Sequence, residues 1–140
     1  MNPKPYIFFN GTARAAIAGH VKVFNSPEPE IMTMGSVPHD GMDISADRLD
    51  WVMHCKLAIG DGSIMISDDF TGNNPNMAGS SIVVNFSTEA EGRAVFDQLA
   101  EGGEIRMAWM PTFWAAGFGQ LSERWGTRWM IGTDAAPSSS

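Results

Sequence analysis

The chain has 140 residues, 44% of them hydrophobic and 18% charged, a composition typical of one globular domain or two small modules. Sixteen acidic against nine basic residues give a net charge of −7, which disfavours sequence-independent binding of DNA or RNA, because such binding needs Lys and Arg. No apolar run approaches the ~20 residues that cross a bilayer, and the N-terminus lacks signal-peptide features, so we expect a cytoplasmic protein without membrane association.

The first half of the chain alternates between strand-like and helix-like patterns. An aromatic run typical of a strand is followed by apolar residues at helical spacing, with Thr12 as the predicted N-cap and Asn25 just beyond the helix. Later runs alternate with period two, as half-buried strands do. The predicted elements are a strand at 6–9, a helix at 12–24 and strands at 30–37, 51–59 and 63–67, with loops at 38–47 and 68–79.

The second half repeats the same order. Thr88 and Glu91 have the spacing of a capping box, which indicates the start of a helix. The predicted elements are a strand at 81–86, a helix at 88–100 and strands at 104–109, 118–124 and 127–131. We therefore expect an α+β protein of two βαβββ modules, 1–72 and 80–134, that form a curved mixed sheet around a cleft, followed by a disordered tail at 135–140.

Several segments, in this order and spacing, are similar to one known family. They are PYIFFNG (5–11), VMHCKL (52–57), IMISD (64–68), MAW (107–109), TFWA (112–115), GFG (117–119), WG (125–126) and WMI (129–131). The set resembles the PhnB-like proteins of the vicinal-oxygen-chelate superfamily, which includes glyoxalases, bleomycin-resistance proteins and dioxygenases. The resemblance covers about residues 5 to 132, and it implies the glyoxalase/bleomycin-resistance fold and a homodimer.

The same resemblance raises the question of a metal. Catalytic members of the superfamily hold one divalent metal with His, Glu or Gln from the first and last strands of each module. In this chain the corresponding positions fall near Pro5, Met65, Ile82 and Met130. None of them carries an oxygen or imidazole donor, so the pattern disfavours the usual metal centre and we predict no cofactor. Neighbouring residues that keep an unconventional metal site open are His54, Ser67, Asp68 and Asp69.

Three neighbouring residues of the 51–59 strand differ in their expected roles. His54 lies on the more polar face and is a candidate catalytic base or ligand contact, because imidazole titrates near neutral pH; the alternative is a structural histidine. Lys56, on the same face, could bind an anionic group or be simply solvated. Cys55 falls on the apolar face, so we expect a buried, inert thiol. Asp68 and Asp69 resemble a metal-binding or capping pair, but we expect a solvated turn.

Aromatic residues of the second half form another candidate site. Phe113, Trp114 and Phe118 lie in a Gly-containing loop that could close over a flat or cationic ligand, or could instead pack in the core or a dimer interface. Trp129 is expected to lie between sheet and cavity. The sequence thus predicts a protein that binds a small apolar or aromatic ligand; the open alternatives are a metal-dependent lyase, isomerase or dioxygenase, and a structural or partner-binding dimer.

Overall fold

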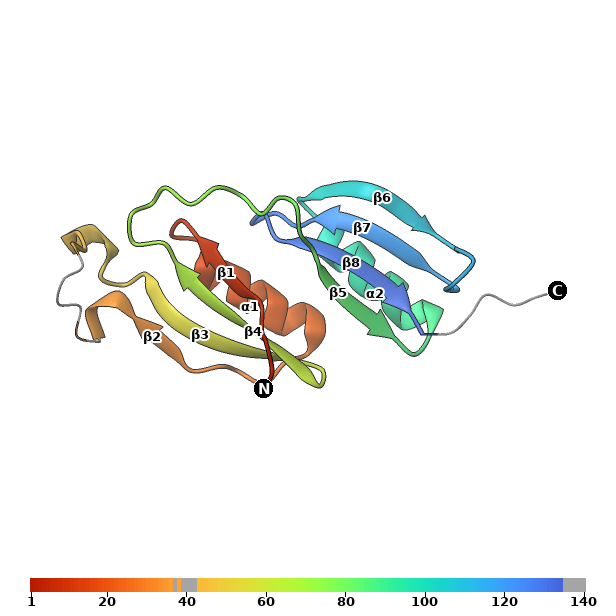
Figure 1. The fold of residues 1–140 in the computed structure, drawn as a ribbon, viewed down its shortest axis with the longest axis horizontal. Coiled ribbons are helices and arrows are strands. Elements are labelled where there is room, and N and C mark those ends of the chain that lie inside the picture. The colour runs from red at the N-terminus through yellow and green to blue at the C-terminus, as the bar shows by residue number, and fades with distance from the viewer. Residues whose placement is uncertain (37, 39–42, 135–140) are drawn as a thin grey trace. The chain divides into compact units, whose positions relative to one another are not determined.

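The computed structural model describes residues 1–36, 38 and 43–134, and the chain divides into two compact units, Met1–Pro75 and a second that begins at Asn76. Each unit contains one four-stranded mixed sheet and one α-helix, in the order βαβββ (Figure 1). The predicted α+β class and the repeated order of elements are confirmed. The tail at 135–140, which we expected to be disordered, lies outside the described residues.

The first unit has the strand order β1-β4-β3-β2, in which β1 runs parallel to β4 and the other pairs are antiparallel. Helix α1 packs against β3 and β4. The elements are β1 (Tyr6–Phe9), α1 (Ala13–Phe24), β2 (Ile31–Thr33), β3 (Val52–Ile59) and β4 (Gly62–Asp68), with 3-10 turns at Met34–Ser36 and Ala46–Arg48. The first and last strands of the unit are therefore neighbours in the sheet.

Strand β2 is shorter than the strand predicted at 30–37. Its register against β3 shifts after Met32, and the chain then enters the 3-10 turn at Met34–Ser36. In that turn the N–H of Met34 donates to the carbonyl of Trp51 at 2.8 Å, so the backbone is satisfied without a strand ladder. Val37 and 39–42, which belong to the predicted strand and loop, lie outside the described residues.

The start of α1 is held by a residue other than the predicted N-cap. Thr12 occupies the predicted N-cap position, but its side chain makes no capping hydrogen bond. Instead, Oδ1 of Asp68 accepts from the N–H groups of Gly11 (2.8 Å) and Ala13 (3.1 Å), and its Oδ2 accepts from the N–H of Val52 (2.9 Å). Asp68 is only 3% exposed, so the expectation of a solvated turn is wrong for this residue.

The second unit has the strand order β5-β8-β7-β6, with β5 parallel to β8. It repeats the arrangement of the first unit, since its first and last strands again pair directly. Helix α2 packs mainly against β7 and β8. The elements are β5 (Ile82–Phe86), α2 (Glu89–Ala100), β6 (Glu104–Met110), β7 (Phe118–Ser122) and β8 (Arg128–Thr133).

Helix α2 begins with the predicted Thr88–Glu91 contact. The hydroxyl oxygen of Thr88 accepts from the N–H of Glu91 at 3.2 Å, which satisfies one of the free N–H groups of the first turn. The Glu91 carboxylate accepts from the Thr88 hydroxyl at 2.9 Å. The predicted cap is therefore present, although the Glu91 side chain binds the Thr88 hydroxyl instead of its backbone N–H.

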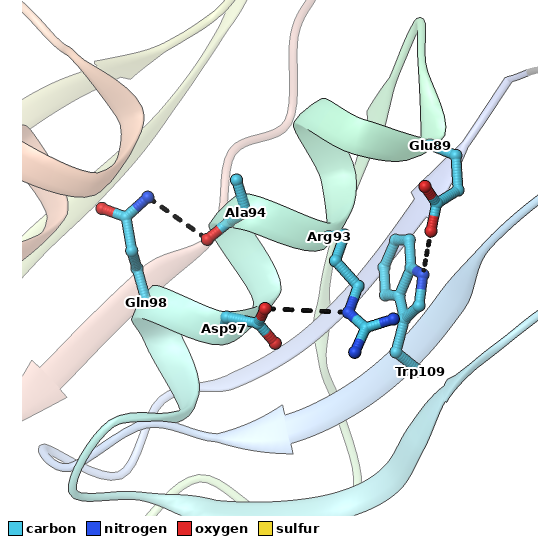
Figure 2. Close-up of polar contacts among 6 residues, drawn as sticks. All are labelled: Glu89, Arg93, Ala94, Asp97, Gln98 and Trp109. Carbon is cyan, nitrogen blue, oxygen red and sulfur yellow. Dashed lines mark hydrogen bonds and ion pairs between the residues drawn. The ribbon is translucent and has the colours of Figure 1, made fainter.

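Two of the acidic side chains of α2 have polar partners, which Figure 2 shows. The indole N–H of Trp109, on β6, donates to the Glu89 carboxylate at 2.8 Å. Arg93 and Asp97 form an exposed i,i+4 ion pair at 3.7 Å, a contact that contributes little to stability. Glu89 thus links the first turn of the helix to the sheet, whereas Asp97 lies on the solvated side.

The core of each unit lies between its sheet and its helix. In the first unit the buried side chains include Ile17, His20, Leu57 and Ile66. In the second unit Phe96, Leu121, Trp129 and Ile131 play the same part. A Cβ atom at Gly119 would lie 2.5 Å from the Phe96 ring, so this close packing of helix on sheet requires glycine. None of the helices in the described part of the chain is long and apolar enough to cross a membrane.

Candidate functional site

The face of the first sheet turned away from α1 carries the candidate site. Along β1, Ile7 and Phe9 are buried, whereas Tyr6 and Phe8 are 43% and 47% exposed, because successive side chains point to opposite faces. Tyr6 pairs with Met65 of β4, and Met65 pairs with Lys56 of β3. These three residues therefore form one row across this face of the sheet. We call the face turned away from α1 the helix-free face.

Tyr6 and His54 form a hydrogen-bonded pair on this face. The phenol oxygen of Tyr6 lies 3.1 Å from Nδ1 of His54, and either group donates, depending on the histidine tautomer. The two rings are 5.9 Å apart, and the Tyr6 ring also stacks on Phe8 at 5.0 Å. The contact fixes the phenol of the chain's single tyrosine above the sheet.

A pocket of about 360 Å³ opens beside this pair, and we call it the Tyr6 pocket. Most of its wall consists of aromatic rings and thioethers: Tyr6, Phe8, Phe70, Met34 and Met53. Such walls adapt to flat or irregular apolar groups, because the rings are rigid and the methionines are flexible. His54 is not part of the wall but hydrogen-bonds to Tyr6, which is. Lys56 lies on the same face as His54 and is also outside the wall.

The polar part of the wall consists of Ser67 and Asp68, at the end of β4, and of Asp69 and Asn74, in the loop that follows. Hydrogen bonds hold this loop in place. The amide of Asn74 donates to the carbonyl of Phe8 at 3.0 Å, and the Asn74 N–H donates to the side chain of Asn10 at 2.9 Å. Oδ1 of Asp69 accepts from both the N–H and the hydroxyl of Thr71. These contacts fix the loop to the end of β1 and hold this part of the wall in place.

Sequence reasoning did not select Tyr6, Phe8 or Phe70 for this site. The signal for Tyr6 and Phe8 was present, because period-two alternation in β1 puts both rings on one face. Phe70 carried no such signal, since it lies in a loop whose path the sequence does not specify. His54 and Lys56 do share a face, as the alternation of their strand predicted.

The aromatic residues predicted in the second unit divide into two groups. Phe113 is 90% exposed and Trp114 is 50% exposed, and their rings meet edge to face at 4.7 Å; Trp114 meets the buried Phe118 at 5.4 Å. Trp129 is fully buried, and its indole N–H donates to Oε2 of Glu123 at 3.0 Å. The Trp129 side chain therefore lies in the core of the second unit, on the same side of β8 as the buried Ile131.

The residues at the superfamily's metal positions do not fit its usual metal. The predicted positions are Pro5, Met65, Ile82 and Met130; the sheet pairing places Tyr6, the residue after Pro5, beside Met65, and Val83, the residue after Ile82, beside Met130. Two thioethers and an alkyl group are not the oxygen and imidazole donors that such metals select, and the one oxygen donor in the set, the Tyr6 phenol, hydrogen-bonds to His54. Among residues 1–36, 38 and 43–134, no group of three or more His, Cys, Asp or Glu side chains could hold a metal ion.

Cys55 is buried in the first unit, as predicted. Burial raises the pKa of its thiol from the ordinary 9.0 to about 11, because the thiolate loses its hydration there. The thiolate is the reactive form of cysteine, so the folded protein keeps this thiol unreactive at neutral pH.

Stability should therefore depend on pH through Cys55. Between about pH 9 and 11 the unfolded thiol loses its proton while the folded thiol keeps it, so the free energy of unfolding falls as pH rises. The full loss is about 2–3 kcal/mol, at 1.36 kcal/mol for each pKa unit. Urea titrations across this range should show that Cys55→Ala removes this part of the slope. A native thiol that reacts rapidly with alkylating reagents near neutral pH would contradict the expectation.

Comparison with known proteins places this fold and sequence in one family. No family model matches the chain. Protein YjdN of Escherichia coli K12 is 32% identical over an alignment of 135 residues, and the match covers 91% of this chain and 91% of that protein. The crystal structure of protein PA1353 from Pseudomonas aeruginosa is 33% identical, with a TM-score of 0.85 over 96% of this chain and 98% of that one.

Two more distant structures are similar in fold alone. A PhnB protein from Bacillus cereus is 23% identical, with a TM-score of 0.72 over 95% of this chain and 99% of its own. The fosfomycin resistance protein FosX from Listeria monocytogenes is 11% identical, with a TM-score of 0.64 over 96% of this chain and 93% of its own. The chain therefore belongs to the PhnB-like family of the vicinal-oxygen-chelate superfamily, with the glyoxalase/bleomycin-resistance fold.

Proposed function

We propose that this protein binds a small ligand with an aromatic or apolar body in the Tyr6 pocket. The observation that carries the proposal is the pocket itself, about 360 Å³ in volume, with three rings and two thioethers in its wall. Ligand sites are typically concave, mostly apolar and supplied with a few positioned polar groups. The Tyr6 phenol, held by His54, supplies such a group at the edge of the apolar wall.

His54 and Lys56 have separate parts in this proposal. His54 holds the Tyr6 phenol in place and contacts the part of the ligand that extends across the helix-free face. Lys56, exposed in the row with Met65 and Tyr6, contacts a substituent beyond the pocket mouth. The aromatic cluster of Phe113, Trp114 and Phe118 is a second proposed ligand surface, on the other unit.

Binding can be measured by NMR on the full chain with labelled methionine methyl groups. We expect aromatic fragments to shift the Met34 and Met53 signals saturably, because both side chains line the pocket. Phe8→Ala should weaken binding about tenfold, the effect of losing roughly 1.4 kcal/mol of ring contact. Trp114→Ala is the matched aromatic control and should leave these shifts unchanged.

Other outcomes of the same titration separate the two surfaces. Loss of binding in Trp114→Ala but not in Phe8→Ala would move the ligand to the aromatic cluster of the second unit. Absence of any saturable shift across a broad set of aromatic fragments would reject ligand binding as the function.

Acid–base catalysis in the same pocket is a second candidate, favoured by the Tyr6–His54 hydrogen bond. Such a pair can pass a proton between a bound molecule and solvent, with His54 as the general base behind the phenol. In D₂O, the protein would then accelerate exchange of an acidic carbon-bound proton of a bound ketone, and Tyr6→Phe would abolish the acceleration while ligand affinity persists. Equal exchange with and without protein would reject this role.

The family resemblance also leads us to propose a homodimer. Large apolar side chains of the second unit are exposed, including Val83, Ile105 and Phe113, and dimer formation would bury part of this surface. Sedimentation equilibrium should report twice the mass of the chain, and a monomer at all concentrations would contradict the proposal.

A further inference from the structure

We infer that the ligand of the Tyr6 pocket is an organic cation, a protonated or quaternary amine with an apolar body. This inference rests on the proposed binding function and specifies the chemical class of the ligand. It is carried by the charge of the wall together with the aromatic rings that share it.

The charged side chains among the described residues that line the pocket are both acidic, Asp68 and Asp69. The three partners of Asp68 are backbone N–H groups, and the two partners of Asp69 are the N–H and hydroxyl of Thr71. None of these partners carries a formal positive charge. The pocket therefore presents negative potential to a ligand, in a chain whose net charge is already −7.

One cationic side chain, Arg48, contacts the same loop, but its partners are a backbone carbonyl and an aromatic ring. Arg48 donates to the carbonyl of Phe70 at 2.7 Å, and its guanidinium lies over the Trp51 ring at 4.7 Å. It is not part of the pocket wall. No Lys or Arg among the described residues of the wall therefore neutralises Asp68 or Asp69.

The aromatic part of the wall favours the same ligand class. Tyr6 and Phe8 stack at 5.0 Å with an angle of 28° between their planes, so the two rings form one extended surface, and Phe70 contributes a third ring. The electron-rich faces of aromatic rings attract ammonium groups, and cages of such rings recognise substituted amines. A carboxylate ligand would meet both the ring faces and two aspartates unfavourably.

The test compares three ligands on one framework: phenylpropylamine, phenylpropanol and phenylpropanoate. Each is titrated into the full chain and followed through the Met34 and Met53 methyl signals. We expect the amine to bind about tenfold more tightly than the alcohol and the carboxylate to bind most weakly. The advantage of the amine should shrink as salt is added, because screening weakens attraction between partly exposed charges.

Two matched variants assign the effect to the pocket. Asp69→Asn removes the charge and keeps an acceptor for Thr71, so it should reduce the preference for the amine several-fold without changing the affinity for the alcohol. Asp61→Asn, in the exposed turn between β3 and β4, removes the same charge elsewhere and should leave the preference intact. Equal binding of amine and alcohol would overturn the inference and leave the proposed function standing, whereas absence of binding by all three and by the wider aromatic set would reject the proposed function.

Discussion

Asp68→Ala should lower the free energy of unfolding of the first unit by about 3–5 kcal/mol. The substitution leaves two buried backbone N–H groups, those of Ala13 and Val52, and the partly buried N–H of Gly11 without their acceptor. Each unsatisfied buried donor costs about 1–3 kcal/mol, and alanine provides no oxygen to replace the carboxylate. Because these donors lie in the turn before α1, at the first residue of α1 and at the first residue of β3, the loss loosens both elements at once.

The experiment needs a readout for each unit. Urea titration gives the change in stability, and hydrogen exchange with mass spectrometry shows which segments open. We expect faster exchange at 11–24 and 52–57 and little change in α2. Asp61→Ala, at an exposed turn, should change stability by less than about 0.5 kcal/mol. A loss below about 1 kcal/mol for Asp68→Ala would show that water or loop movement replaces the missing acceptor.

In the second unit, Glu123→Ala should cost about 2–4 kcal/mol for a similar reason. Glu123 is 4% exposed; its Oε1 accepts from the N–H of Thr127 at 3.0 Å and its Oε2 from the indole N–H of Trp129 at 3.0 Å. The side chain therefore closes the turn between β7 and β8 and holds the largest side chain of the core. Its removal takes this acceptor away from both donors in the core.

Tryptophan fluorescence reports this change, because four of the five tryptophans follow residue 76. Glu123→Ala should shift the emission to longer wavelength and lower the midpoint of unfolding. Glu123→Gln keeps one acceptor oxygen, so its emission wavelength and unfolding midpoint should lie between those of the unaltered protein and those of Glu123→Ala. Glu104→Ala, at the exposed start of β6, is the control and should behave like the unaltered protein. An unchanged emission spectrum in Glu123→Ala would contradict the role given to the carboxylate.

The sequence was sufficient to predict the helices, most strands and the repeated βαβββ order, because these depend on local periodicity. Helix α2 is the clearest example, since both its apolar spacing and its Thr88 cap are encoded within a few residues. The shortened β2 is the main failure, because its end is set by hydrogen bonds to Leu49 and Trp51. Such contacts have no local signal.

The candidate site was less predictable, because its contacts join residues far apart in the chain. Asp68 and its two partners at the start of α1 are 57 and 55 residues apart, and Tyr6 and His54 are separated by 48. The strand alternation did place His54 and Lys56 on one face. It could not show that the strand order brings Tyr6 to that face as well. Nor could alternation show that Trp129 lies in the core, because it does not say which side of a sheet the helix covers.

The pairing of β1 with β4 also has a consequence during synthesis. Tyr6 can pair with Met65 only after Met65 has left the ribosome. The two are separated by roughly 60 residues, which take about 3–12 seconds to synthesise at typical elongation rates. Throughout that time Ile7 and Phe9 remain on a nascent strand without a sheet to join. We therefore expect a chaperone that binds exposed apolar residues at the ribosomal tunnel exit to bind this segment.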